Sequence, residues 1–348
     1  MNSNELAASA PPWGPGSILR RPIRVSGRRW AFTTAVVAPL LAIGGLWSFS
    51  ARAAPPNDPG HPPAISTVRL PVSVLGGLRV SELSGLAWDN DEQMLYGISD
   101  RGHLLRFRLR LDSGRLTAVE PLDAVRLHAP VQSLPGSAGL DAEGLAILKG
   151  DNGVVGDAEL LVSTEGQPQV WRVSTGGEVL GRLKLPDRLS DARRYPADNA
   201  MLEAVAHSPL HGLLAAAEAP LADQAADFHE VHAEARSWRF PALDGGRSRL
   251  KAMEVLPDGS LVVLERARVG KGKGLINALR RFGLASCGAE VICAPQTLLL
   301  IDPATGAENF EGMAQLGEDR FLLVSDNMGD KQAPSIFLLV DLKAALRK

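Results

Sequence analysis

Short apolar runs recur along residues 66–342, and acidic or turn-forming residues separate them. Five stretches share one order: an acidic residue, an apolar run, a turn, a second apolar run and another acidic residue. They run from ELSGLAWD to YGISD, from DAEGLAIL to LLVSTE, from MLEAVAHS to LLAAAE, from AMEVLPDG to LVVLE, and from NFEGMAQL to FLLVSD. Such uninterrupted apolar runs are typical of strands that are buried on both faces.

The spacing of these stretches indicates the fold. Their first acids are separated by 61, 60, 51 and 57 residues and are Glu82, Glu143, Glu203, Glu254 and Glu311. This period fits a four-stranded propeller blade with variable loops, and it exceeds the period of most solenoids. We therefore expect an all-β protein, a β-propeller of five four-stranded blades, or of six if one repeat is degenerate.

The two ends of the repeat region predict how the ring closes. The fifth repeat ends with SIFLLVDL (335–342) and lacks a fourth strand, whereas STVRLPVSVL (66–75) precedes the first repeat without a partner. Pairing these segments removes two exposed strand edges. We expect the N-terminal strand to complete the last blade.

The first 53 residues follow a different pattern. Several arginines, among them the pair Arg28-Arg29, precede an uncharged apolar run (31–47), and small residues (51–54) follow it. These are the three parts of a secretory signal. We expect a signal peptide over residues 1–53, of twin-arginine type if the substitution of Ala31 in that motif is tolerated, a linker over 54–65 and the propeller domain over 66–348. The predicted location is periplasmic or secreted, and an uncleaved membrane anchor is the alternative.

Charge and cysteine content narrow the class of partner. Without residues 1–53 the chain holds 31 Lys and Arg against 38 Asp and Glu, a net charge of −7, which argues against binding to nucleic acid. Cys287 and Cys293 lie close together in one segment, and in an oxidising compartment they are expected to form a disulfide. We expect a monomer that binds a small anionic or ester substrate and touches a membrane only through an uncleaved N-terminal segment.

The acidic residues of the repeats are the candidate ligands. In antiparallel neighbours the start of one strand lies beside the end of the next, so the acids should collect at one rim of the channel. Carboxylates on flexible loops suit calcium, and the expected metal ligands are Glu82, Asp100, Glu143, Glu254, Glu265, Glu311 and Asp326. The alternative is that these acids bond only the backbone of adjacent blades.

A basic segment of the fourth repeat (266–297) lies where a flap over this rim is expected. Arg266, Lys271 and Lys273, together with Arg101, are the expected contacts of an anionic substrate. The chain has neither a G-x-S-x-G elbow nor an H-E-x-x-H motif, so hydrolysis would use metal-activated water. The candidate general bases are Glu143, Glu311 and Asp326, while His229 and His232 are expected at the surface.

The phrases ELSGLAWD, DAEGLAIL, LPDGSLVVLER, NFEGM and LLVSDN resemble the phytase-like family described as "esterase-like activity of phytase", over about residues 68–342. The resemblance implies an exported β-propeller that is related in architecture to calcium-dependent alkaline phytases and hydrolyses esters. The third repeat departs from the pattern, because Ala204 rather than glycine follows Glu203, so Glu203 and Glu218 are left out of the expected site.

These features favour a calcium-assisted hydrolase of an ester or phosphoester. Two alternatives stay open. One is a lactonase-type hydrolase that uses rim carboxylates and one divalent ion, and the other is a non-catalytic periplasmic propeller that binds a sugar, a peptide or an envelope protein.

Overall fold

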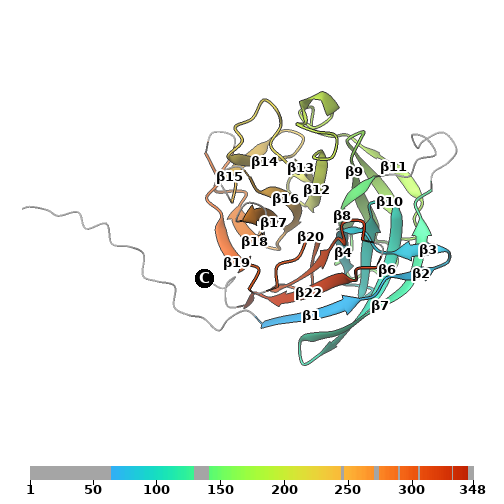
Figure 1. The fold of residues 1–348 in the computed structure, drawn as a ribbon. Coiled ribbons are helices and arrows are strands. Elements are labelled where there is room, and N and C mark those ends of the chain that lie inside the picture. The colour runs from blue at the N-terminus through green and yellow to red at the C-terminus, as the bar shows by residue number, and fades with distance from the viewer. Residues whose placement is uncertain are drawn as a thin grey trace, which may run out of the picture. The chain divides into compact units, whose positions relative to one another are not determined.

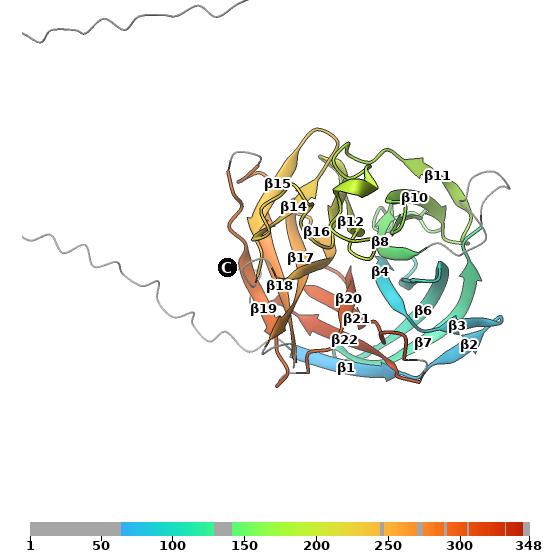
Figure 2. The same cartoon turned by 45° about the horizontal axis from the view of Figure 1, so that its top comes forward.

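The computed structural model describes residues 64–128, 141–243, 247–269, 274–288, 291–304, 306–330 and 332–343. The expected signal peptide and most of the linker lie outside the described residues. Four-stranded antiparallel sheets surround a central axis in a five-bladed β-propeller (Figures 1 and 2). The predicted all-β propeller is confirmed, with five blades in the part of the chain that the structure describes.

The strands of each blade follow one another from the axis outward. Blade 1 contains β4 (Leu83–Asp89), β5 (Met94–Ser99), β6 (His103–Asp112) and β7 (Arg115–Arg126). Blade 2 contains β8 (Ala142–Leu148), β9 (Glu159–Thr164), β10 (Gln169–Ser174) and β11 (Val179–Leu183). Blade 3 contains β12 (Leu202–Ser208), β13 (Gly212–Ala217), β14 (Phe228–His232) and β15 (Ser237–Pro241). Blade 4 contains β16 (Arg249–Val255), β17 (Ser260–Val269), β18 (Gly274–Gly283) and β19 (Gln296–Ile301).

Blade 5 is built from both ends of the repeat region. It contains β20 (Phe310–Gln315), β21 (Arg320–Ser325), β22 (Ser335–Asp341) and, as its outer strand, β1 (Ala64–Leu70). The pairing of β1 with β22 runs from Ala64 opposite Asp341 to Leu70 opposite Ser335. The predicted closure by the N-terminal strand is therefore confirmed. A hairpin of β2 (Ser73–Leu75) and β3 (Leu78–Val80) then leads into blade 1.

The inner strands β4, β8, β12, β16 and β20 contact one another in a closed ring (Figure 2). They pack so closely that a Cβ atom on Gly144 would lie 2.1 Å from the backbone oxygen of Glu203. A similar atom on Gly85 would lie 2.7 Å from the backbone nitrogen of Leu145. The glycines after the repeat acids are therefore needed for the approach of neighbouring blades.

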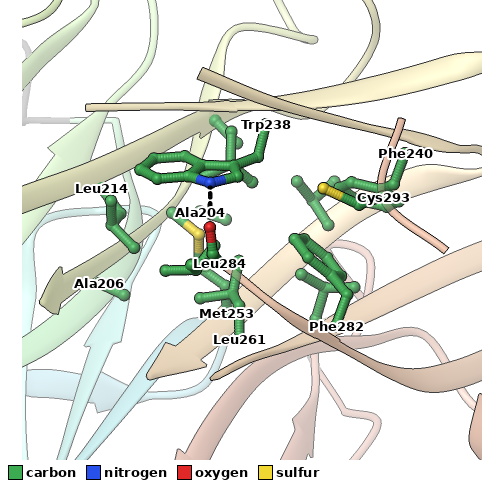
Figure 3. Close-up of a cluster of buried hydrophobic side chains, with 14 of the residues drawn as sticks. Ala204, Ala206, Leu214, Trp238, Phe240, Met253, Leu261, Phe282, Leu284 and Cys293 are labelled. Carbon is green, nitrogen blue, oxygen red and sulfur yellow. Dashed lines mark hydrogen bonds between the residues drawn. The ribbon is translucent and has the colours of Figure 1, made fainter. Parts of the chain in front are cut away.

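Apolar layers between the blades form the core. Figure 3 shows the layer between blades 3 and 4, where Trp238 and Phe240 pack with Met253 and Phe282. The indole nitrogen of Trp238 donates to the backbone oxygen of Leu284 at 2.9 Å, which satisfies the buried N–H group.

The predicted disulfide between Cys287 and Cys293 is present, with an S–S distance of 2.04 Å, and both residues belong to the layer that Figure 3 shows. The one helical element among the described residues is the single 3-10 turn η1 (Ala192–Arg194). Within these residues no helix has the length and apolarity to cross a membrane.

Candidate functional site

Each inner strand begins with a β-bulge that interrupts its pairing with the second strand of its blade. A bulge redirects the side chain of the extra residue. The residues in the bulges are Ser84, Glu143, Glu203, Lys251 and Glu311. The residues at the equivalent point of the second strands are Asp100, Glu165, Glu218, Arg266 and Asp326. These ten residues form a ring of side chains, which is called the ring below. Blades 1, 2, 3 and 5 contribute carboxylates to the ring, whereas blade 4 contributes two cations, Lys251 and Arg266.

This register corrects the interpretation of blade 4. Lys251, and not Glu254, occupies the position of the first repeat acid, because Leu250 pairs with Glu265 at the start of β16. Glu254 lies near the other end of β16 and accepts a hydrogen bond from the backbone nitrogen of Gln315 at 3.2 Å. Its placement at the common rim was wrong. Burial raises the pKa of Glu254 to about 8.

Glu265 is also separated from the rim, because it is sealed between blades 3 and 4. Its carboxylate accepts hydrogen bonds from Arg280 at 2.5 Å, from Ser248 Oγ at 2.9 Å and from the backbone nitrogen of Leu243 at 2.8 Å. His229 Nε2 lies 3.0 Å from the same Ser248 hydroxyl. The expected metal ligand is therefore fully committed to structural contacts.

The two histidines of the third repeat are buried rather than at the surface. His229 is 1% exposed and His232 is 4% exposed. Burial lowers the pKa of both imidazoles. Their surface placement, predicted from the acidic residues around them, was wrong because β14 is not an exposed loop but the third strand of its blade.

Lys251 neutralises one half of the ring. Its ammonium forms an ion pair with Glu203, lies 2.9 Å from Glu218 Oε1 and lies 3.4 Å from Glu311 Oε1. Burial by itself lowers the pKa of a lysine, but these three carboxylates outweigh it and hold the pKa of Lys251 above its ordinary value. Arg266, whose guanidinium is 2.5 Å from Glu311 Oε1, adds a second positive charge.

Glu311 consequently differs from the other buried acids of the ring. Burial favours its protonated form, but Lys251 and Arg266 reverse this effect and lower the pKa of Glu311. Arg266 also contacts the side chain of Asn309. Arg266, which was expected to bind substrate, therefore pairs with an acid of the ring instead.

On the other half of the ring the charge of Lys251 lowers the pKa of Glu143 and Glu165 without forming an ion pair with them. Oxygen atoms of Asp141, Glu143 and Glu165 lie within 4.8 Å of one another, and among the described residues no basic side chain forms an ion pair with them. Burial, followed by the charge of Glu203, raises the pKa of Glu143 to about 11. Burial likewise raises the pKa of Glu165 to about 7, even though Glu165 accepts a hydrogen bond from the backbone nitrogen of Met201 at 2.7 Å.

A cavity of about 750 Å³ adjoins this half of the ring. The cavity is lined by Gly77, Leu78, Arg79, Glu82, Asp100, Arg101, His103, Arg126 and Asp141. Asp141 therefore belongs both to the cavity wall and to the acidic group with Glu143 and Glu165. Glu143 and Glu165 do not belong to the lining of this cavity, so Asp141 is the member of the acidic group that reaches its wall.

Asp100 is the second acid of interest in the cavity wall. Its Oδ1 atom is buried and has no hydrogen-bond partner among the described residues. Burial, followed by the charge of Glu82, raises the pKa of Asp100 to about 7. The neighbouring Arg101 forms a two-point ion pair with Glu82, with Nη2 2.7 Å from Oε1, so the predicted substrate contact Arg101 holds a carboxylate of the chain.

Asp326 lies apart from this cavity, in the wall of a second one of about 380 Å³. It accepts hydrogen bonds from the backbone nitrogen of Met328 at 2.8 Å and from Asn309 Nδ2 at 3.3 Å. Burial, followed by the charge of Glu311, raises the pKa of Asp326 to about 6. Of the predicted catalytic acids, Glu143 and Glu311 are brought together, and Asp326 adjoins Glu311, because Asn309 Nδ2 donates to both carboxylates.

The predicted basic flap of blade 4 is instead a long hairpin. β17 continues to Val269 and β18 begins at Gly274, and the two strands pair from Ser260 opposite Gly283 to Val269 opposite Gly274. Lys271 and Lys273 lie outside the described residues.

Sequence reasoning missed Lys251, Asp141 and the inclusion of Glu165 and Glu203 in the site. The alignment of Leu250-Lys251-Ala252 with Leu202-Glu203-Ala204 contains the signal, because apolar residues flank the charged one in both segments. A search for acids alone passes over it.

The sequence also matches a known protein family, in agreement with the propeller fold. The sequence profile of the phytase-like family, described as "Esterase-like activity of phytase", matches residues 78–328. The chain belongs to the phytase-like family. The match contains every residue of the ring and all but one of the residues that line the larger cavity, the exception being Gly77.

Other comparisons add no functional information about this phytase-like propeller. No curated protein matches it. A solved structure titled "Structure of U3-55K" is 12% identical, covers 75% of this chain and 77% of its own, and has a TM-score of 0.36. A likeness at that level carries no argument about function.

Proposed function

We propose that this phytase-like propeller is an exported hydrolase of an ester or phosphoester and that a divalent cation, calcium by its ligand chemistry, assists it. The observation that carries the proposal is the charge imbalance of the ring. Asp141, Glu143 and Glu165 gather without a basic partner among the described residues, and they do so beside a cavity of about 750 Å³. Membership of the family supports a hydrolytic role.

The residues present fit a calcium ion. Three carboxylates supply hard oxygen ligands within 4.8 Å of one another, and calcium accepts six to eight oxygen ligands in flexible geometry. Burial raises the pKa of Glu143 and of Glu165, and the charge of Lys251 offsets this rise only in part. Asp141, Glu143 and Glu165 would hold the ion, which when bound would polarise a substrate oxygen.

The cavity wall supplies the remaining chemistry. Asp100, with a pKa of about 7, can accept a proton from water near neutral pH and is the candidate general base. Glu82 and Arg101 hold each other in place beside it. Arg79 and Arg126 line the same cavity and favour a substrate that carries negative charge.

Export and a monomeric state are part of the proposal. The N-terminal pattern of basic, apolar and small residues supports a signal peptide. The disulfide between Cys287 and Cys293 supports residence in an oxidising compartment.

The test is hydrolysis by the chain that begins at residue 54. Nitrophenyl acetate, nitrophenyl phosphate and phytate are offered with calcium, with excess chelator, and with calcium restored. We expect turnover of at least one substrate, its loss in chelator and its recovery with calcium. A D141N/E165Q variant should behave as the chelated protein does, whereas E254Q, altered at the opposite end of β16, should match the unmodified chain.

Two results contradict the proposal in different ways. Turnover that persists unchanged in chelator removes the cation from the mechanism. Absence of turnover on all three substrates favours a propeller that only binds its ligand.

A further inference from the structure

Within the described residues, two groups of carboxylates have metal-like spacing, and Glu143 belongs to both. The first is Asp141, Glu143 and Glu165, and the second is Glu143, Glu203 and Glu311. The second group differs from the first in one respect. A lysine ammonium already lies among its oxygen atoms.

We infer that Lys251 is a built-in counter-cation that closes the Glu143–Glu203–Glu311 group to metal and confines a divalent ion to Asp141, Glu143 and Glu165. The inference rests on the cation of the proposed function. It makes Lys251 a positioning residue, since the lysine acts through the carboxylates that it neutralises.

The contacts of Lys251 leave little room for another cation. Its side chain is 4% exposed and that of Glu203 is 3% exposed. The ammonium contacts Glu203 and Glu218 directly and lies 3.4 Å from Glu311. A divalent ion bound by Glu203 and Glu311 would have to displace this ammonium or lie against a like charge in a site that excludes water.

Further basic side chains of blade 4 pair with the acids around Lys251. Arg266 forms an ion pair with Glu311 and lies 3.6 Å from Glu218, whose other oxygen lies 3.6 Å from Arg249. Basic side chains of blade 4 therefore pair with Glu203 and Glu218 of blade 3 and with Glu311 of blade 5. The acids of blade 2 remain for a metal ion.

The position of Lys251 in the bulge of β16 explains its reach. Blades 2, 3 and 5 place a glutamate in the corresponding bulge. A lysine at this point projects into the ring that those glutamates form, and its long unbranched stem carries the charge to its centre.

The inference is tested by calcium titration calorimetry of the metal-free chain from residue 54. We expect the unmodified chain to bind one equivalent of calcium. K251M keeps an unbranched apolar stem and removes the charge, so it should bind a second equivalent or bind calcium at least tenfold more tightly. K251R, which keeps the charge, and K184M, altered at an exposed lysine that pairs with Glu234, should bind as the unmodified chain does.

The titration separates the inference from the proposed function. One equivalent bound with unchanged affinity in K251M overturns the role of Lys251 and leaves the proposed cation intact. Binding by K251M alone, with none by the unmodified chain, supports the role of Lys251 and overturns the proposed cation. Absence of calcium binding by both chains overturns both.

A folding defect does not prevent the test. If K251M folds only when calcium is present, the calcium dependence itself supports the inference. If it is unfolded in both conditions, K251M/E203Q is titrated instead, because this pair removes one of the carboxylates left without a partner. Stoichiometry and affinity equal to those of E203Q alone would then overturn the inference.

Discussion

Arg280 and Glu265 face each other across neighbouring strands of blade 4, with Nη1 2.5 Å from Oε1, and the glutamate is fully buried. The pair lies on the side of β17 that faces blade 3, where Ser248 and His229 complete its hydrogen bonds. Because Glu265 accepts hydrogen bonds from both Arg280 and Ser248, its removal leaves these buried donors without their acceptor.

E265A should therefore destabilise the propeller by about 3–5 kcal/mol, since it leaves the Arg280 charge buried without its partner. The free energy of unfolding is measured by urea denaturation. E234A provides the matched control, because its carboxylate pairs with Lys184 in solvent and its loss should cost less than about 1 kcal/mol. Equal effects of the two substitutions would show that the buried pair contributes no more to the free energy of unfolding than the exposed pair does.

G144A should disrupt the contact between blades 2 and 3. The added Cβ would lie 2.1 Å from the backbone oxygen of Glu203 and 2.6 Å from Ser163 Oγ, and forced overpacking typically costs about 1–3 kcal/mol. Urea denaturation checks this against G181A, where a Cβ meets nothing within 4 Å. A G144A protein as stable as G181A would contradict the close approach of β8 and β12.

Glu254 should make the stability of the chain fall as pH rises. Burial raises its pKa to about 8 from an ordinary value of 4.5, so the folded chain holds a proton that the unfolded chain releases. The stabilising contribution is complete below about pH 4.5 and is lost as pH rises through 8. Urea denaturation at pH 5, 7 and 9 should show a smaller decline for E254Q. Parallel declines in both proteins would assign the pH dependence to other groups.

Asp100 should give hydrolysis a rising limb with pH. The base form is needed, and its pKa of about 7 places the midpoint there, or lower when a bound cation favours the carboxylate. D100N should lose the limb and lower kcat by about 100-fold or more. D112N, altered at the exposed end of β6 in blade 1, should keep both. An unchanged pH profile in D100N would exclude Asp100 as the base.

The period of the repeats was sufficient to predict the blades and the closing strand, because buried apolar runs recur wherever β strands must pack on both faces. The ring of charged side chains was harder to predict from the sequence. In blade 4 the bulge residue is Lys251, so a pattern defined by acids moved three positions along the chain to Glu254. Because a strand advances by about 3.3 Å per residue, this shift moved the prediction toward the other end of β16.

The contacts that separate Glu265 from the ring could not be predicted from local sequence. They come from Arg280 on the next strand and from His229 in another blade, and such pairs depend on the completed fold. The same holds for Asp141, which becomes significant only because it lines the cavity that Arg79 and Arg126 also line.

Because β1 pairs with β22, the propeller can close only late in the synthesis of this protein. The ribosome produces β1 before all other strands of the ring and β22 after all of them, so blade 5 is incomplete until translation has passed residue 341. Until then the newly made chain has an open edge on β1 that can pair wrongly with other strands. Ring closure is therefore a late event, and a chain truncated within β22 should accumulate as an aggregation-prone species rather than as a smaller propeller.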